Sequence, residues 1–207
     1  MSTLEQILEH KIVAIIRGAD PNEVSRIAEA LYAGGIRILE ITLNSASPLA
    51  VIKKVSERMG DRMVIGAGTV LEVQEACDAV AAGAKFVLSP VVDQEVIRAA
   101  KDLGVVSIPG AYTATEVYRA YKCGADIVKV FPATSPAYIK DLTGPLPQIP
   151  LLPTGGISLQ NIAEYKKAGA VGFGMGTALV NTKLSVTEQY LADITANAKM
   201  LVEAIKA

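Results

Sequence analysis

The amino-acid sequence predicts an α/β protein of the (β/α)8 TIM-barrel class. Its 207 residues are 51% hydrophobic but only 5% aromatic, a mix typical of closely packed α/β layers. Short apolar runs alternate with longer helical segments at about 23 residues per unit, and eight such units follow one another. Eight βα units indicate a closed barrel, and an open doubly wound sheet is the alternative.

The units follow one another without a linker, so we expect one domain over residues 1–207. A short amphipathic helix at 3–9 precedes the first strand and is placed to close the amino-terminal end of the barrel. Proline marks helix starts at Pro21 and Pro48, and glycine-containing turns end most helices. The expected strands are 11–16, 36–43, 63–65, 85–88, 105–108, 126–130, 149–152 and 171–174. The helices that follow them end near residues 34, 60, 83, 104, 124, 142, 169 and 206.

Composition excludes several classes of function. The net charge is −1 with both signs interspersed, and neither a long apolar run nor a signal-peptide pattern is present. We therefore expect no nucleic-acid or membrane partner and a cytoplasmic location. Cys77 and Cys123 fall in alanine-rich helical patterns and are expected to be packing residues. His10 is the single histidine, and any histidine-containing triad or histidine-based zinc site would have to use it. We therefore expect neither a triad nor a metal.

Lys129 lies inside an apolar strand that Pro132 ends. Side chains alternate along a strand, which puts Ile127, Lys129 and Phe131 on one face. Desolvation in a barrel interior lowers the pKa of a lysine from about 10.4, and a drop of about three units leaves roughly a quarter neutral at pH 7. Only the neutral amine attacks a carbonyl, which makes Lys129 a candidate for Schiff-base formation. The alternative is a lysine that extends to solvent or pairs with a carboxylate.

Glu40 is likewise flanked by apolar residues, within strand 36–43. Burial raises the pKa of such a carboxylate, and a charged Lys129 nearby lowers it again. Together the two groups would supply an amine nucleophile and a proton shuttle; the alternatives are a structural ion pair or a Glu40 turned toward Arg37. In a barrel, the functional residues lie at the carboxyl ends of the strands and in the loops that follow them. Six side chains fall there, on six different strands or the segments that directly follow them: Arg17, Glu40, Thr69, Pro90, Lys129 and Thr154.

Two glycine-rich loops follow the seventh and eighth strands. Gly155-Gly156 opens one, and residues 174–177 form the other. Backbone N–H groups exposed by glycines cradle phosphates, and barrels commonly place that site after these two strands. The loops therefore predict a phosphate or carboxylate site; the alternative is a pair of tight turns. Further candidates around a substrate are Arg17 as an anion clamp, Thr69 as a hydrogen-bond donor and Phe131 as a wall; the alternatives are a solvated charge at a strand end, a simple turn and simple packing.

Taken together, these motifs resemble the family of 2-keto-3-deoxy-6-phosphogluconate aldolases, also called KDPG/4-hydroxy-2-oxoglutarate aldolases. The resemblance runs from about residue 11 to residue 180, with the pieces in order. The matching pieces are residues 15–18 (Ile-Ile-Arg-Gly), 39–43 (Leu-Glu-Ile-Thr-Leu), 66–70 (Gly-Ala-Gly-Thr-Val), 88–90 (Leu-Ser-Pro), 108–110 (Ile-Pro-Gly), 128–133 (Val-Lys-Val-Phe-Pro-Ala) and 153–157 (Pro-Thr-Gly-Gly-Ile).

The resemblance implies a metal-independent, Schiff-base (class I) aldolase, usually a homotrimer, that needs no cofactor beyond the covalent imine with its substrate. It implies reversible cleavage of a 2-keto-3-deoxy-6-phospho sugar acid to pyruvate and glyceraldehyde 3-phosphate, as in Entner–Doudoroff carbohydrate metabolism. Lys129 matches the imine-forming lysine and Glu40 the general acid/base. The substrate-binding positions are Arg17, Asn44, Thr69, Pro90, Phe131 and Thr154, and the phosphate-binding positions are Gly155, Gly156, Gly176 and Thr177.

Two features depart from the common pattern of this family. Many members carry an arginine four residues after the glutamate, whereas this chain has Asn44, followed by Ser45, which resembles the branch acting on 2-keto-3-deoxy-6-phosphogalactonate. The loop at 132–136 is also shorter than usual. The alternative functions are a phosphate-binding barrel isomerase or epimerase, and a non-catalytic barrel used as an assembly subunit.

Overall fold

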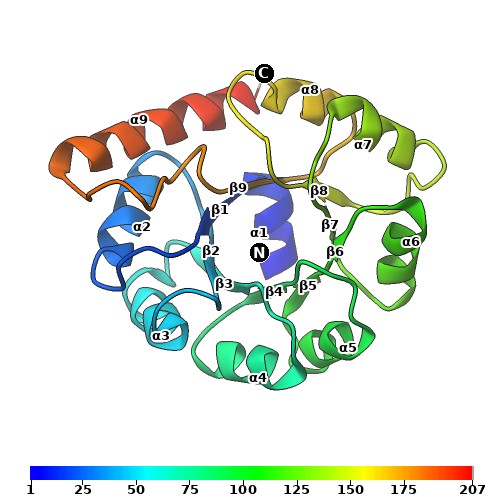
Figure 1. Ribbon diagram of the computed structural model, residues 1–207, viewed down its shortest axis with the longest axis horizontal. Coiled ribbons are helices and arrows are strands. Elements are labelled where there is room, and N and C mark those ends of the chain that lie inside the picture. Colours follow the sequence, from blue (N-terminus) through cyan, green and yellow to red (C-terminus); the bar gives the residue numbers. More distant parts are fainter. Residues whose placement is uncertain (207) are drawn as a thin grey trace.

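Parallel strands stand around a common axis, and helices cover their outer side (Figure 1). The computed structural model describes residues 1–206. The strands are β1 (Ile12–Ile16), β2 (Ile38–Thr42), β3 (Val64–Gly68), β4 (Phe86–Leu88), β5 (Val106–Ile108), β6 (Gly110–Ala111), β7 (Val128–Val130), β8 (Leu151–Pro153) and β9 (Phe173–Met175). The helices are α1 (Thr3–His10), α2 (Val24–Ala33), α3 (Pro48–Met59), α4 (Val73–Ala81), α5 (Gln94–Asp102), α6 (Ala114–Lys122), α7 (Pro136–Thr143), α8 (Ile162–Lys167) and α9 (Glu188–Ala204).

The prediction of one closed eight-stranded barrel is wrong. The strands form two parallel sheets, a six-stranded sheet in the order β5-β4-β3-β2-β1-β9 and a three-stranded sheet in the order β6-β7-β8. One break falls at Pro109, directly after the expected fifth strand: β5 ends at Ile108 and the separate short strand β6 begins at Gly110, because proline has no N–H to give to a ladder. The other falls between β8 and β9, which share one isolated bridge, Thr154 with Gly174. The strands curve around the axis, but their hydrogen bonds do not close.

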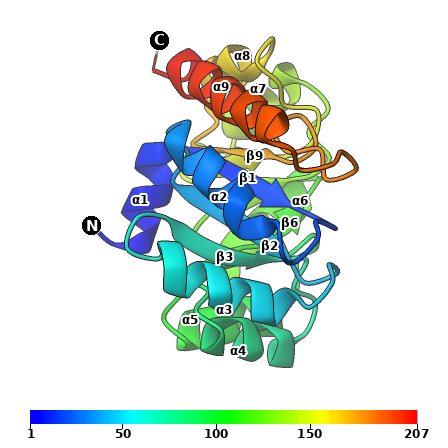
Figure 2. The same cartoon turned by 90° about the vertical axis from the view of Figure 1, so that its left-hand side faces the viewer.

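A buried apolar cluster fills the space that the strands enclose. Side chains from β1, β2, β3, β4, β5 and β8 meet there, together with Ile127 before β7 and Ile7 from α1. Ile7 is 1% exposed, and α1 covers the end of the strands where their amino termini lie (Figure 2). The expected helix at 3–9 is therefore present and closes that end. The opposite end, where the strands finish, is left for the site.

A second, larger cluster lies between the strands and the outer helices. Alternate strand residues such as Ala14, Leu39 and Ile65 face it, as the period of two along a strand requires. Helix boundaries largely follow the predicted signals: Pro48 begins α3 and Gly60 ends it. Pro21 differs, because it lies in a turn and α2 begins only at Val24. In residues 1–206, every helix is too short or too polar to cross a membrane.

Candidate functional site

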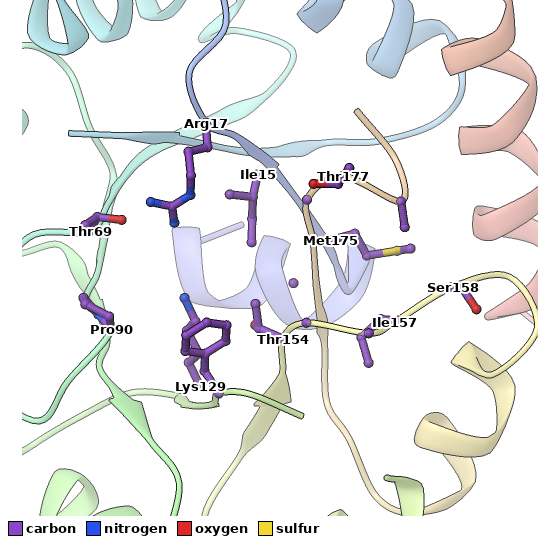
Figure 3. Close-up of a pocket in the computed structure, with 16 residues that line it drawn as sticks. Ile15, Arg17, Thr69, Pro90, Lys129, Thr154, Ile157, Ser158, Met175 and Thr177 are labelled. Carbon is purple, nitrogen blue, oxygen red and sulfur yellow. The ribbon is translucent and has the colours of Figure 1, made fainter. Parts of the chain in front are cut away.

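A cavity of about 610 Å³ opens where the strands end at their carboxyl termini. Figure 3 shows Arg17 and Lys129 extending into this cavity from different strands, with Thr154 beside them. Ten of the residues proposed from sequence line it: Arg17, Thr69, Pro90, Lys129, Phe131, Thr154, Gly155, Gly156, Gly176 and Thr177. Segments spread over most of the chain are brought together here because parallel strands end at the same edge.

Lys129 lies in the middle of β7 and is only 4% exposed. Its neighbours on the strand, Val128 and Val130, are fully buried and face the outer cluster. Burial lowers the pKa of Lys129, the charge of Glu40 raises it again, and Arg17 lowers it. The amine lies 4.8 Å from the centre of the Phe131 ring, a distance typical of a cation–π contact. The net effect is an amine that loses its proton more easily than an exposed lysine.

Glu40 lies on β2, behind the cavity wall, and is fully buried. Burial raises the pKa of its carboxyl group, whereas Lys129 and Arg17 lower it. Among residues 1–206, neither carboxylate oxygen receives a hydrogen bond, and no Lys129–Glu40 ion pair within 4.0 Å is formed. The structural ion pair is therefore not formed in this structure. Arg37 is also not a partner, since it donates to the backbone carbonyls of Tyr32 and Ile36.

Room for the Glu40 carboxylate comes from a missing side chain on the neighbouring strand. Gly68 ends β3, and a Cβ atom there would lie 1.7 Å from Glu40 Oε1. Real Cβ atoms do not approach oxygen so closely, so only glycine permits this position of the carboxylate. Gly174 does the same for Thr154, whose hydroxyl oxygen would lie 2.2 Å from an added Cβ atom. Sequence reasoning included Gly68 in a family motif and Gly174 in a predicted anion loop, and it missed the part of both glycines in making space.

Arg17 follows β1 and reaches over the mouth of the cavity. Its Nη1 donates to Asn44 Oδ1 at 2.9 Å, and the next backbone N–H, of Gly18, donates to Ser45 Oγ at 2.9 Å. Thr182 Oγ1 donates to the carbonyl oxygen of Arg17 at 2.7 Å. Asn44 thus contacts the arginine and is not among the residues that line the cavity.

The two glycine loops lie side by side on the rim. Gly155 and Gly156 have φ of +87° and +70°, conformations that favour glycine. In the described part of the chain, the backbone N–H groups of Gly156, Ile157 and Thr177 donate to no protein acceptor. Free N–H groups of this kind attract an anion. Asn161 Nδ2 supports the loop by donating to the carbonyl of Gly156 at 2.8 Å.

The remaining residues of the lining are mostly small or apolar. Phe131 lies at the rim with 43% of its surface exposed. Its ring is so close to Gly155 that a Cβ atom at that position would be in van der Waals contact with it. Thr154 is 5% exposed and its hydroxyl has no partner within residues 1–206. Gly174 and Met175 also line the cavity and belong to the predicted anion loop at 174–177, whereas sequence reasoning missed four lining residues: Ile15, Ile157, Ser158 and Ala178. Their signal was available, since each is within two residues of a site residue that was named.

A parallel α/β fold that holds a buried amine and a buried carboxylate near a rim with unpaired backbone N–H groups is suited to the chemistry of a Schiff-base aldolase. The model of the family described as KDPG and KHG aldolase matches residues 4–196, and the chain belongs to this family. The protein is therefore a lyase. Membership favours the aldolase interpretation over an isomerase, an epimerase or a non-catalytic assembly subunit.

Individual relatives agree with the family. The chain is 35% identical over 178 residues to 2-dehydro-3-deoxy-6-phosphogalactonate aldolase of Escherichia coli K12, covering 84% of this chain and 87% of that protein. It is 42% identical over 157 residues to 2-dehydro-3-deoxy-phosphogluconate aldolase of Pseudomonas aeruginosa, covering 74% and 70%. The solved structure "Native KDPGal structure" is 32% identical, covers 94% of both chains and superposes with a TM-score of 0.87.

One further solved structure bears on the chemistry. It is the KDPG aldolase of Legionella pneumophila with pyruvate captured at low pH as a covalent carbinolamine intermediate. This chain is 27% identical to it, covers 98% of its own length and 96% of that chain, and superposes with a TM-score of 0.76.

Proposed function

We propose that this protein cleaves its substrate through an imine on Lys129, with Glu40 moving the protons. The reaction is that of a class I aldolase, which cleaves a 2-keto-3-deoxy-6-phospho sugar acid reversibly to pyruvate and glyceraldehyde 3-phosphate. One observation carries the assignment of residues: the amine of Lys129 lines the cavity and has a lowered pKa, the buried carboxyl group of Glu40 behind it has a raised pKa, and each charge alters the pKa of the other. Two ionisable groups whose environments shift their pKa values in opposite directions are typical of acid–base pairs.

The first half of the mechanism forms the imine. The neutral Lys129 amine attacks the C2 carbonyl carbon, and the carbonyl oxygen takes up a proton to give a carbinolamine. Glu40 in its acid form then protonates the C2 hydroxyl group, which leaves as water and yields the cationic imine. The raised pKa of Glu40 keeps a fraction of it protonated for this step.

The second half breaks the carbon–carbon bond. Glu40, now a carboxylate, removes the proton of the C4 hydroxyl group. The C3–C4 bond breaks, its electron pair forms the C2=C3 double bond, and the C=N π pair moves to the cationic nitrogen, which gives an enamine and free aldehyde. Glu40 returns the proton to C3, and water hydrolyses the resulting pyruvate imine. One carboxyl group serves each step because the steps need it alternately as acid and as base.

The rim supplies the binding groups in this proposal. The loops after β8 and β9, with Gly155, Gly156, Gly176 and Thr177, hold the phosphate through their backbone N–H groups. Support comes from the unpaired N–H groups of Gly156, Ile157 and Thr177, and from the glycines, which let the backbone approach an oxyanion. Arg17 faces the keto-acid end, and other groups surround the pyruvate part: Thr69, Pro90, Phe131 and Thr154.

Asn44 bears on which substrate the enzyme prefers. We place the protein in the galactonate branch of the family, supported by Asn44-Ser45 after the glutamate strand and by the relative of that name in Escherichia coli. The measurement is kcat/KM for the 6-phosphorylated gluconate- and galactonate-derived keto acids, each compared with its unphosphorylated form. A preference for the gluconate form would contradict this placement.

The assembly that we propose is a homotrimer of one-domain chains, residues 1–207, in the cytoplasm. Large apolar side chains remain exposed on successive loops at the site end, among them Leu71, Val91 and Tyr112, which favours burial against other copies. The free thiols of Cys77 and Cys123 are compatible with a reducing compartment. The molar mass measured by light scattering, as the protein elutes from a sizing column, tests the trimer.

Borohydride trapping tests the catalytic assignment. Pyruvate with sodium borohydride should add one reduced pyruvate to the intact protein, and peptide mapping should place it on Lys129. Lys129→Met should take up none, while Lys199→Met, on the exposed face of α9, should label like the parent protein. Label on another lysine, or none, would contradict the proposal.

A further inference from the structure

The turn after β2 holds the cavity's arginine in place. Two consecutive residues of this turn each accept a hydrogen bond from the loop after β1: Asn44 Oδ1 from the Arg17 side chain and Ser45 Oγ from the Gly18 backbone, both at 2.9 Å. Ser45 Oγ also lies 2.9 Å from the hydroxyl oxygen of the fully buried Thr42. The Asn44–Ser45 turn is therefore itself fixed to the end of β2.

The Arg17 side chain needs such a hydrogen bond to be held in one orientation. Both Arg17 and Asn44 are exposed at the mouth, and no carboxylate pairs with the guanidinium group anywhere in residues 1–206. A free arginine side chain has many rotamers, and only some of them direct its charge into the cavity. A hydrogen bond from Nη1 to a fixed acceptor selects among those rotamers before substrate arrives, which reduces the entropy lost on binding.

The chemistry of the acceptor also matters. An asparagine amide accepts the hydrogen bond without contributing charge, so the guanidinium keeps its full positive charge for an anionic substrate group. An aspartate in the same place would hold the arginine but neutralise it. An arginine there would repel it.

We propose that Asn44 is a positioning residue, which holds Arg17 in the cavity through its amide oxygen while Ser45 fixes the backbone beyond it. This inference rests on the proposed imine chemistry at Lys129. It replaces the expectation that Asn44 binds substrate directly, because the amide oxygen already faces the arginine. The role extends to Lys129, since the charge of Arg17 lowers the pKa of that amine.

The test is a double-mutant cycle of Asn44→Ala with Arg17→Ala. In the parent protein, Asn44→Ala should raise KM for the phosphorylated keto acid about 3- to 10-fold, the loss typical of one hydrogen bond, with a smaller change in kcat. In the Arg17→Ala background the same change should have no further effect, because the two residues act as one unit. Asn22→Ala, an exposed asparagine on the neighbouring loop, is the matched control and should leave both constants unchanged.

A second measurement, the pH profile of trapping, should change if Asn44 positions Arg17 and should not change if the role of Asn44 is merely structural. The pH profile of pyruvate trapping on Lys129 should move to higher pH in Asn44→Ala, because a displaced Arg17 no longer lowers the pKa of the amine. Asn44→Asp should move it in the same direction and raise KM even though it keeps the hydrogen bond, because its carboxylate neutralises Arg17.

The outcomes separate the two proposals. If the parent protein traps no pyruvate on Lys129, the proposed function fails. If it traps pyruvate but Asn44→Ala leaves KM and the pH profile unchanged, the positioning role is overturned and the proposed function stands. An Asn44→Ala effect that persists in full without Arg17 overturns the positioning role as well and indicates direct substrate contact.

Discussion

Replacing Gly68 with alanine should displace the carboxylate of Glu40 from its place beside Lys129. Gly68 ends β3 with an ordinary strand backbone, so alanine meets no conformational strain there. Its methyl group would, however, lie 1.7 Å from Oε1, 2.4 Å from Cδ and 2.6 Å from Cγ of Glu40. Ordinary contact needs about 3.5 Å, so the carboxylate must move by more than about 1 Å.

A displacement of this size in a reacting group typically costs about 10²-fold in rate. We therefore expect Gly68→Ala to lower kcat roughly 100-fold, with little change in KM because the binding groups on the rim are not touched. The assay is pyruvate release under saturating keto acid, with circular dichroism as the check on folding.

Two further variants decide whether the loss acts through the glutamate. Gly66→Ala, on the same strand, meets the Phe86 ring at 2.4 Å and should cost stability while leaving kcat within a few-fold. In a Glu40→Gln background, Gly68→Ala should cause almost no additional loss. The reasoning is refuted if folded Gly68→Ala turns over like the parent, or if it lowers kcat by the same factor with and without the Glu40 carboxylate.

Three other predictions concern the same pair and the closed end of the strands. Glu40→Gln should fold normally and lower kcat by about 10²–10⁴-fold, and near-parental turnover would rule out its role in proton transfer. Burial raises the pKa of Glu40, so the folded protein binds more protons than the unfolded chain just above pH 4.5, and its stability should fall as pH rises through that window. Denaturant unfolding of Glu40→Met should lack this decline; an identical pH dependence would show that the buried carboxyl does not cause it. Ile7→Ala should lower the free energy of unfolding by about 2–5 kcal/mol because it empties the end of the inner cluster. Pyruvate trapping on the remaining folded protein should be unchanged, and loss of less than 1 kcal/mol would argue that α1 does not contribute to this core.

Much of the local structure follows from sequence signals that act over a few residues. Proline and glycine set the ends of α3. The apolar runs predicted most strand boundaries to within two or three residues. The closed barrel was predicted because eight repeated units suggested eight equal strands. That prediction ended the fifth strand at residue 108 and did not foresee the separate strand β6 after Pro109, nor the few hydrogen bonds between β8 and β9.

The sequence by itself placed a lysine and a glutamate inside apolar strands, and elementary desolvation already made them candidates for chemistry. Only the tertiary structure decided what lies against them. The space that Gly68 leaves for Glu40 and the contact of Asn44 with Arg17 each join residues 27 or 28 positions apart, through strand register. Register depends on how whole strands pack side by side, so no pattern within a single segment can report it.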